Sequence, residues 1–338
     1  MYSPPRMTAV TLEASFLDYL RAVRLARSPN TVRTYRNAVQ AFRACLDGLG
    51  VDPKTQPARI ANENWVGDFA AHLRNYAPAS ERLYLTAISG WYEFLSAESL
   101  AELNLPRLRS LIRRRARRPG QRLPQFPREA IEEILAAATG ISSAGDDEPA
   151  RLRGLRDRAL LFTLADTGLR VHEAVGLRRG DLDWNEGRAL MIGKGDREAV
   201  VRFSNRSLRY LRAYLEARSS RDGSSGRPLS ALPLFARHDP ASGKRVLPIS
   251  TTTARSIVHE RARQALGDRH QAAITPHSFR HYFVTTVLRG SGGNLKLAQE
   301  LARHRSIAVT QRYAHLSDDE LDRGYHEIFE SGKTLAKG

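Results

Sequence analysis

A tyrosine lies among cations near the end of this 338-residue chain, in the stretch LARHRSIAVTQRYAH at residues 301–315. The residue is Tyr313, and its neighbours in sequence include His304 and Arg312. A tyrosine phenol has a pKa of about 10, so it attacks an electrophile at neutral pH only where cations or a base lie close by. Because this stretch supplies such neighbours, Tyr313 is a candidate nucleophile.

Two arginines could bind the charge that builds up during such an attack. Arg170 follows the turn at Gly168, and Glu173 is spaced to hold its guanidinium through charge-assisted hydrogen bonds. Arg280 lies in HSFRH, residues 277–281, three residues after His277 and so on the same helical face. Guanidinium forks neutralise the non-bridging oxygens of a phosphodiester better than single-point cations do. These residue types therefore suit phosphoryl transfer.

Lys194 stands between two glycines in the turn of an expected hairpin over residues 189–203. A lysine there could protonate the leaving sugar oxygen as a general acid. The turn lacks the spacing of a Walker loop, so we expect no ATP chemistry. His277 and His281 leave a zinc hydrolase as an alternative, although nothing in the sequence specifies a third ligand. Our expectation is that the protein uses neither metal nor cofactor.

The overall charge indicates a polyanionic partner. The chain has 53 Lys and Arg against 36 Asp and Glu, a formal net charge of +17, which favours double-stranded DNA. Anionic membranes or ribosomal contacts would fit the charge alone. The apolar runs fall well short of the ~20 residues that cross a bilayer, and MYSPPRMTAV lacks a signal-peptide core, so we expect a cytoplasmic location without membrane contact. Cys45, a lone cysteine, excludes an intramolecular disulfide and is expected in the core.

Two domains are expected to position the candidate residues, in a mainly α fold with a small antiparallel β-sheet. Amphipathic helices near 12–28, 31–48, 62–75 and 79–97 predict a four-helix bundle over 8–100, with Leu83 among its inward residues. A basic linker is expected over 101–127, where residues 107–118 include seven arginines and no acid. The larger domain, 128–330, should be mostly helical with one hairpin, and RSSRDGSSGRP at 218–228 should be a flexible surface loop. The candidate DNA contacts are Arg33, Arg36, Arg113, Arg114 and Arg115.

Four stretches together resemble the tyrosine recombinase or phage integrase family: TGLRVHEAVGL, IGKGDREAVVRF, HSFRH and LARHRSIAVTQRYAHL, in the family's order. The resemblance covers about residues 8–318 and implies a core-binding domain followed by a catalytic domain. It also implies that Tyr313 attacks a DNA phosphate, giving a 3′-phosphotyrosine and a free 5′-hydroxyl without ATP or metal. The residues that it places around Tyr313 are Arg170, Lys194, His277, Arg280 and His304.

The resemblance implies an assembly and leaves alternatives open. Relatives usually act as tetramers on two duplexes, so we expect a homo-tetramer, or a hetero-tetramer with a related recombinase. An apolar stripe after Tyr313 would dock on a neighbour or on its own domain: Leu321, Tyr325, Ile328 and Phe329. Arg303 stands where many relatives have glycine. The alternative functions are a DNA-binding regulator or architectural protein that does not cleave, and a relaxing topoisomerase of the same chemistry.

Overall fold

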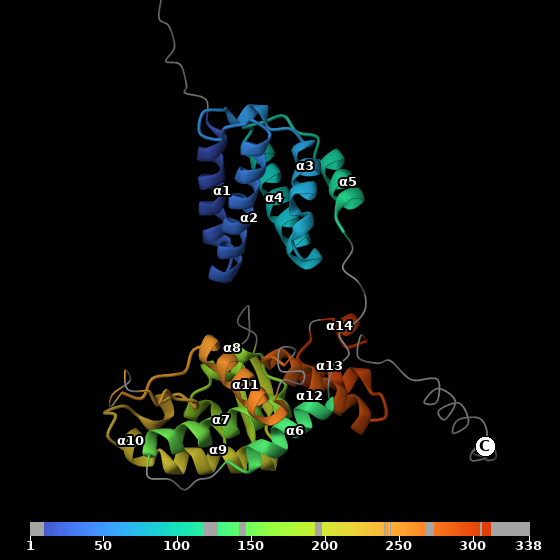
Figure 1. The fold of residues 1–338 in the computed structure, drawn as a ribbon. Coiled ribbons are helices and arrows are strands. Elements are labelled where there is room, and N and C mark those ends of the chain that lie inside the picture. Colours follow the sequence, from blue (N-terminus) through green and yellow to red (C-terminus); the bar gives the residue numbers. More distant parts are fainter. Residues whose placement is uncertain are drawn as a thin grey trace, which may run out of the picture. The chain divides into compact units, whose positions relative to one another are not determined.

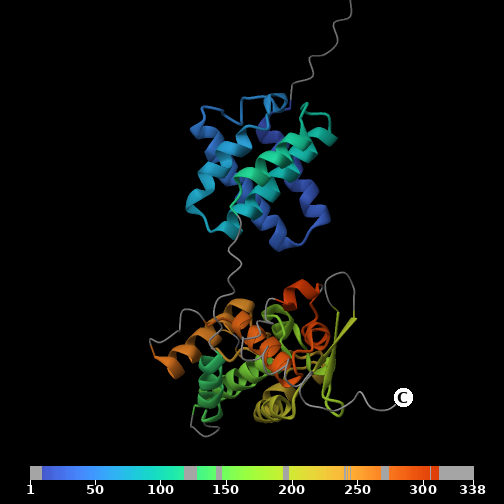
Figure 2. The ribbon, with the colours of Figure 1, turned by 90° about the vertical axis from the view of Figure 1, so that its right-hand side faces the viewer.

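A computed structural model of the chain divides it into two compact units, Met1–Arg122 and Leu123–Gly338 (Figures 1 and 2). The structure describes residues 10–117, 128–141, 147–192, 198–239, 241, 243, 245–267, 274–304 and 306–311. Each unit has its own apolar core. Within the described residues, no helix combines the length and the apolar character that crossing a membrane requires.

The first unit is the predicted helical bundle. Its helices are α1 Leu12–Ala26, α2 Pro29–Gly48, α3 Trp65–His72, α4 Pro78–Ala97 and α5 Leu105–Arg115. Side chains cap the first two: the Thr11 hydroxyl accepts the N–H of Ala14 at 3.1 Å, and the Ser28 hydroxyl accepts that of Thr31 at 3.4 Å. Proline in the first turn of α2 and α4 costs no internal hydrogen bond, because those N–H groups have no helical partner.

Aromatic rings fill the centre of the bundle. Phe16 of α1 lies 4.6 Å from Trp91 of α4, and Phe42 of α2 lies 5.0 Å from Phe69 of α3, measured between ring centroids. Cys45 is buried in this core, as predicted. Leu83, expected inside, is 45% exposed, because the buried face of α4 is formed by positions 81, 85, 87, 88, 91, 92 and 95 and Leu83 lies beyond its edge.

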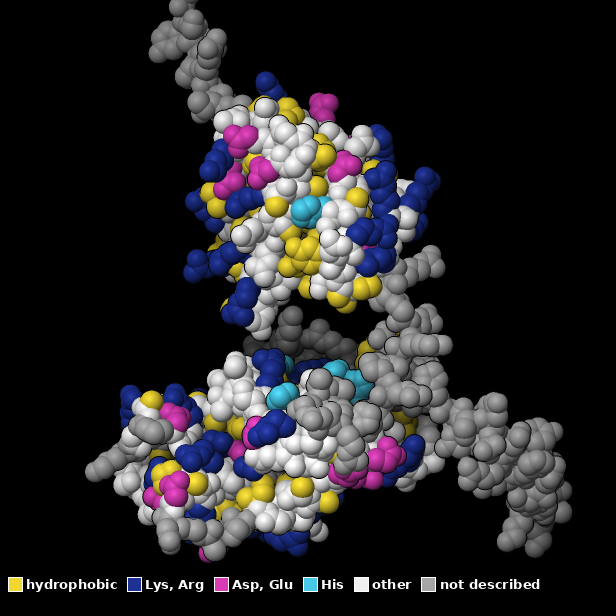
Figure 3. Space-filling model, viewed as in Figure 1, with side chains coloured by type: hydrophobic (Ala, Val, Ile, Leu, Met, Phe, Trp, Pro, Cys, Tyr) yellow, Lys and Arg dark blue, Asp and Glu magenta, His cyan; other side chains and the backbone are white. Residues whose placement is uncertain are grey.

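Helix α5 occupies the start of the segment expected to be an interdomain linker. It packs against α3 and α4 and buries Leu108 completely. Acids distant in sequence pair with arginines of this segment: Arg109 of α5 pairs with Glu93, and Arg117, two residues after α5, pairs with the fully buried carboxylate of Glu81. The described part of the segment is thus built into the first unit, and Figure 3 shows Lys and Arg side chains gathered over its surface near α5.

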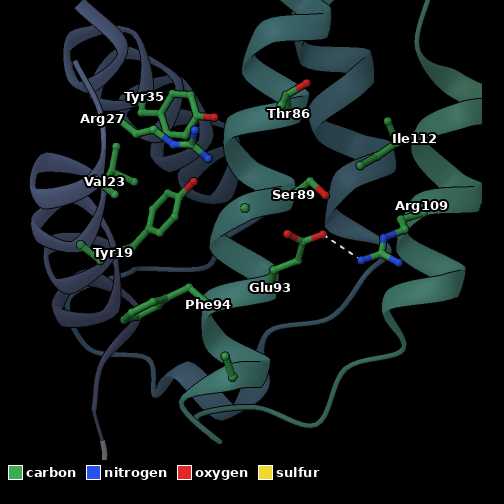
Figure 4. Close-up of a pocket in the computed structure, with 14 residues that line it drawn as sticks. Tyr19, Val23, Arg27, Tyr35, Thr86, Ser89, Glu93, Phe94, Arg109 and Ile112 are labelled. Atoms are coloured by element: carbon green, nitrogen blue, oxygen red, sulfur yellow. Dashed lines mark hydrogen bonds and ion pairs between the residues drawn. The ribbon is translucent and has the colours of Figure 1, made fainter. Parts of the chain in front are cut away.

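A groove opens between α1 and α4 in the same unit (Figure 4). Tyr19 crosses its floor and donates its hydroxyl hydrogen to the carbonyl of Ala87 at 2.7 Å. Gly90 permits this approach, since a Cβ there would lie 3.4 Å from Tyr19 Cζ and closer still to its hydroxyl oxygen. Glu93 and Arg109 form an ion pair along one wall, with 3.0 Å between nitrogen and oxygen.

The second unit is mostly helical, as expected. Its helices are α6 Arg128–Thr139, α7 Glu148–Thr167, α8 Val171–Gly176, α9 Asn205–Ala217, α10 Ser219–Gly223, α11 Thr251–Leu266, α12 Pro276–Gly290, α13 Leu295–Ala302 and α14 Ile307–Gln311. Helix α7 is buried on nearly all sides and packs against α6, α9 and α12. Its buried Asp157 is paired with Arg156 and, from α11, with Arg261, whereas the buried Arg158 donates to the carbonyl of Ile141.

The sheet has three antiparallel strands in the order β1 Leu182–Asp183, β2 Arg188–Ile192 and β3 Glu198–Arg202. This confirms the predicted hairpin. In register, Ala189 faces Val201 on the buried side, and Leu190 faces Val200 on the other side. Leu190 is 61% exposed, so the outer face of the hairpin presents apolar side chains to solvent.

The expected loop at 218–228 is wrong in its first half. Arg218 is fully buried and pairs at 2.9 Å with the equally buried Asp222, and α10 spans residues 219–223. The guanidinium also donates to the carbonyl of Pro233 and to the hydroxyl of Tyr214, both at 2.9 Å. This stretch, although rich in serine and glycine, therefore contains a buried arginine that pairs with an acid and donates hydrogen bonds from both terminal nitrogens.

Candidate active site

Arg170 is placed by the turn that ends α7. Gly168 closes the helix in the left-handed conformation, with φ 60° and ψ 22°, and Arg170 is the N-cap of α8. As predicted, Glu173 holds it: the carboxylate accepts the backbone N–H of Arg170 at 2.8 Å and its Nη1 at 2.9 Å. The side chain of Arg170 stays 43% exposed, so the guanidinium is fixed at its base and open toward solvent.

Arg280 reaches the same region from α12. Helix α12 begins with a capping box between Thr275 and Ser278 and with Pro276 in its first turn. Arg280 is 2% exposed, and its guanidinium donates to the carbonyl of Gly168 at 2.5 Å and to that of Ala302. It therefore joins the end of α7, which leads to Arg170, to the end of α13.

His304 is positioned by the packing of α13 on α12. The apolar contact between the two helices is formed by Val284, Leu288, Ala298 and Ala302. The chain then turns back: the N–H of His304 donates to the carbonyl of Gln299 at 3.0 Å, and its Nδ1 lies 2.8 Å from the hydroxyl oxygen of Thr310 on α14. Thr310 is fully buried, so its hydroxyl fixes the orientation of the imidazole.

Burial and nearby cations keep the histidines of the site neutral. Burial, followed by the charges of Arg280, Arg170 and Arg303, lowers the pKa of His304 to about 4. Burial, Arg280 and Arg170 also lower the pKa of His277. Burial is also the main reason that the pKa of His281 is lowered to about 4. The ring centroid of His281 lies 4.5 Å from that of His277. All three imidazoles are therefore uncharged at neutral pH.

The structure thus gathers the described candidates from three separate segments. We call Arg170, His277, Arg280, Arg303 and His304 the candidate-site cluster; Figure 3 shows histidine and arginine side chains close together on this unit. Lys194 and Tyr313 lie outside the described residues, the first between β2 and β3 and the second two positions after α14. In the first unit Arg33, Arg36, Arg113, Arg114 and Arg115 are exposed.

Two features of the site were not assigned from the sequence. Thr310 was given no role, because a contact between residues six apart requires the intervening turn to be known. Arg303 was noted only as a difference from the glycine that many relatives have there. It adopts the left-handed conformation, with φ 55° and ψ 45°, and bonds to Glu173. Among the described residues, no group of three or more His, Cys, Asp or Glu side chains is arranged to hold a metal ion.

The sequence patterns of two protein domains match this chain. The pattern described as the phage integrase family covers residues 126–320, and that of the phage integrase N-terminal SAM-like domain covers residues 14–99. Among characterised relatives, tyrosine recombinase XerD of Mycobacterium tuberculosis is 32% identical over 308 residues, which is 88% of this chain and 90% of the relative. XerC of Pelobacter propionicus is 28% identical over 326 residues, 94% of this chain and 97% of the relative.

Solved structures share the fold. The XerH site-specific recombinase bound to a palindromic difH substrate, in a post-cleavage complex, superposes with a TM-score of 0.62 over 96% of this chain and 99% of that one, at 17% identity. The Tn1549 transposon integrase in complex with a circular intermediate DNA also gives 0.62, at 15% identity, over 95% of this chain and 100% of that one. On the strength of the sequence matches, this chain belongs to the phage integrase family of tyrosine recombinases.

Proposed function

We propose that the protein cleaves and rejoins DNA strands at specific sites through a 3′-phosphotyrosine on Tyr313, without metal or ATP. The observation that carries the proposal is that Arg170, Arg280 and His304 lie together in one region of the second unit. His304 lies three residues before α14 begins. The energy of the broken phosphodiester is retained in the phosphotyrosine, so rejoining needs no external energy source.

Arg170 and Arg280 bind the two non-bridging oxygens of the scissile phosphate. From α12, Arg280 donates to the carbonyl of Gly168, two residues before Arg170, and to that of Ala302, so the phosphate meets donors that are already in place. Preorganised donors are effective because they need not reorient as charge develops in the transition state. Removing one such donor commonly slows a reaction by about 10²–10³-fold.

Proton transfer is divided between two residues. The phenol of Tyr313 loses its proton as its oxygen attacks phosphorus. His277 accepts that proton; burial and Arg280 lower its pKa, so the imidazole is unprotonated at neutral pH and has a free lone pair. The bond from phosphorus to the 5′-oxygen breaks, and Lys194 donates the proton that this oxygen needs. With the Thr310 hydroxyl donating to Nδ1 of His304, the Nε2–H of that ring donates to a phosphate oxygen.

Assembly into a tetramer follows from the chemistry of exchange, because two duplexes carry four cleavage sites. A groove at the candidate-site cluster offers an attachment surface for the C-terminal stripe. Its lining includes Arg170, Arg303 and His304 together with the exposed apolar side chains Leu190, Val200 and Leu297. The stripe at Leu321, Tyr325, Ile328 and Phe329 supplies matching apolar side chains, from a neighbour or from the same chain.

The deciding experiment is covalent capture. The full-length protein is incubated with fragmented DNA of its own genome in EDTA, and detergent then releases all DNA that is not covalently attached. Sequencing the retained DNA identifies the site, and a duplex nicked beside the cleaved phosphate accumulates the adduct. We expect that Tyr313→Phe forms none. An adduct that persists in Tyr313→Phe would contradict the assignment of the nucleophile.

The same experiment separates the alternative functions. A salt-sensitive complex with no covalent DNA under any condition would favour a regulator or architectural protein that does not cleave. Relaxation of supercoiled DNA without exchange between sites would favour a topoisomerase. Activity that EDTA abolishes would favour a metal-dependent hydrolase and would contradict the proposed mechanism.

A further inference from the structure

Arg303 occupies a backbone conformation that disfavours an arginine. It ends α13 with φ 55° and ψ 45°, the left-handed region in which a side chain crowds the neighbouring carbonyl. Among the described residues, Ser99 is the other non-glycine residue with positive φ. A glycine would meet no such penalty at position 303, so the side chain must provide something that offsets the cost.

The side chain of Arg303 is turned into the protein. It is 14% exposed, its Nη2 lies 3.3 Å from Oε2 of Glu173, and its Nη1 donates to the carbonyl of Leu301 at 3.2 Å. Burial lowers the pKa of this guanidinium, and the Glu173 carboxylate opposes that effect. An arginine at the end of a short helix could extend into water, so its burial against this carboxylate is a specific contact.

The same carboxylate also fixes Arg170. Oε1 of Glu173 accepts Nη1 of Arg170 at 2.9 Å, and Oε2 accepts its backbone N–H at 2.8 Å and faces Arg303. Burial by itself raises the pKa of Glu173, but these hydrogen bonds and both guanidiniums outweigh it, so the pKa is lowered and the group is ionised. One negative charge is thus shared by two positive charges.

This sharing has an electrostatic consequence for Arg170. A carboxylate that orients a guanidinium also cancels much of its positive potential, which weakens its attraction for a phosphate. A second guanidinium on the same carboxylate restores a net positive charge and leaves the geometry intact. We propose that Arg303 is a positioning residue that shares Glu173 with Arg170, so that Arg170 is held in place and keeps its full attraction for the scissile phosphate. The proposal rests on the proposed function, since it concerns the same phosphate.

Substitutions at position 303 distinguish this role from a purely structural one. If Arg303 only fills space, Arg303→Gly should be harmless, because glycine suits the backbone better. If its charge acts through Glu173, Arg303→Gly and Arg303→Gln should both slow cleavage about tenfold, which corresponds to a loss of about 1.4 kcal/mol in transition-state stabilisation. Arg303→Lys, which keeps the charge, should recover most of the rate.

The experiment measures single-turnover cleavage of the nicked duplex by the full-length protein at saturating DNA. Ser99→Gly is the control for relieving positive φ, and Arg221→Gln, which breaks an arginine–glutamate pair with Glu148, is the control for losing one such pair. Each duplex is made with either a normal or a methylphosphonate linkage at the scissile position. The methylphosphonate lacks the negative charge, so the deficit of Arg303→Gly should shrink to about twofold or less on that substrate.

Each result supports or overturns a specific claim. A tenfold deficit on the normal duplex, largely lost on the methylphosphonate and recovered by Arg303→Lys, supports the proposal. Wild-type rates in Arg303→Gly, or an undiminished deficit on the methylphosphonate, would overturn it while leaving the proposed function intact. Failure of the wild-type protein to form any Tyr313 adduct would overturn the proposed function, and the role of Arg303 with it.

Discussion

A single added carbon at Gly168 should disturb the candidate active site. The φ of 60° at Gly168 is unfavourable for alanine, and a Cβ there would lie 2.8 Å from Cγ of Phe283 on α12, closer than real Cβ contacts allow. The left-handed conformation costs alanine about 1 kcal/mol. Forcing a methyl group into the occupied space adds about 1–3 kcal/mol. We therefore expect Gly168→Ala to destabilise the second unit by roughly 3 kcal/mol.

Calorimetry can measure this loss separately for each unit. A destabilisation of about 3 kcal/mol corresponds to a decrease in Tm of roughly 6–12 °C for a domain of this size. Gly90→Ala places a Cβ against Tyr19, so it should lower the Tm of the first unit and thereby identify the unfolding transition of that unit. Gly168→Ala should leave that transition unchanged. Cleavage should also slow, because the carbonyl of Gly168 accepts a hydrogen bond from Arg280.

Two further variants separate the contributions. Gly226 has φ 68° with open space around its Cβ position, so Gly226→Ala should show the backbone cost alone, about 1 kcal/mol. In a Phe283→Ala background, Gly168→Ala should likewise cost only about 1 kcal/mol, because the atoms that it meets are gone. An unchanged Tm in Gly168→Ala, or the same loss in both backgrounds, would refute the reasoning.

Three other expectations concern protons and salt. The pKa of His304 is about 4 when folded and ~6.5 when unfolded, so stability should fall as pH decreases from about 6.5 toward 4. At pH 5 the stability lost through His304 amounts to about 2 kcal/mol. Thermal unfolding at pH 7 and pH 5 should show this loss in the wild-type protein but not in His304→Asn. Lys194→Ala should cleave slowly, and a 5′-thio leaving group, which needs no proton, should restore much of the rate; no restoration would remove Lys194 from the acid role. Replacing Arg113, Arg114 and Arg115 by glutamine should reduce the dependence of log K on log salt by about 3 units at most; an unchanged slope in binding titrations would show that these arginines do not contact phosphate.

The helices could be predicted because their signals are local. Apolar spacing along α1, α2 and α4 determines which face is buried, and alternation defined the hairpin. Helix α5 was not predicted, because the burial of Leu108 against α3 and α4 and the ion pairs of its segment with Glu81 and Glu93 join residues that lie far apart in the sequence. The burial of Arg218 likewise depends on carbonyls at 233 and 234, although its pairing with Asp222 four residues later was a readable helical signal.

The same distinction holds in the candidate active site. The bond between Arg170 and Glu173 joins residues three apart, and it was predicted correctly. The acceptors of Arg280 lie 112 and 22 residues away in sequence, and Glu173 meets Arg303 across 130 residues. Residue types predicted which side chains could serve the chemistry, whereas the contacts that hold them depend on how α7, α12 and α13 meet.

The position of Arg280 links chemistry to the completion of the fold. Its guanidinium is oriented by the carbonyls of Gly168 and Ala302, which come together only when α7 and α13 have both packed against α12. In its proposed role, an arginine oriented in this way binds a phosphate only after the last helices are in place. A newly made or partly unfolded chain would therefore be unable to cut the genome that encodes it, which makes correct folding a safeguard against stray DNA breaks.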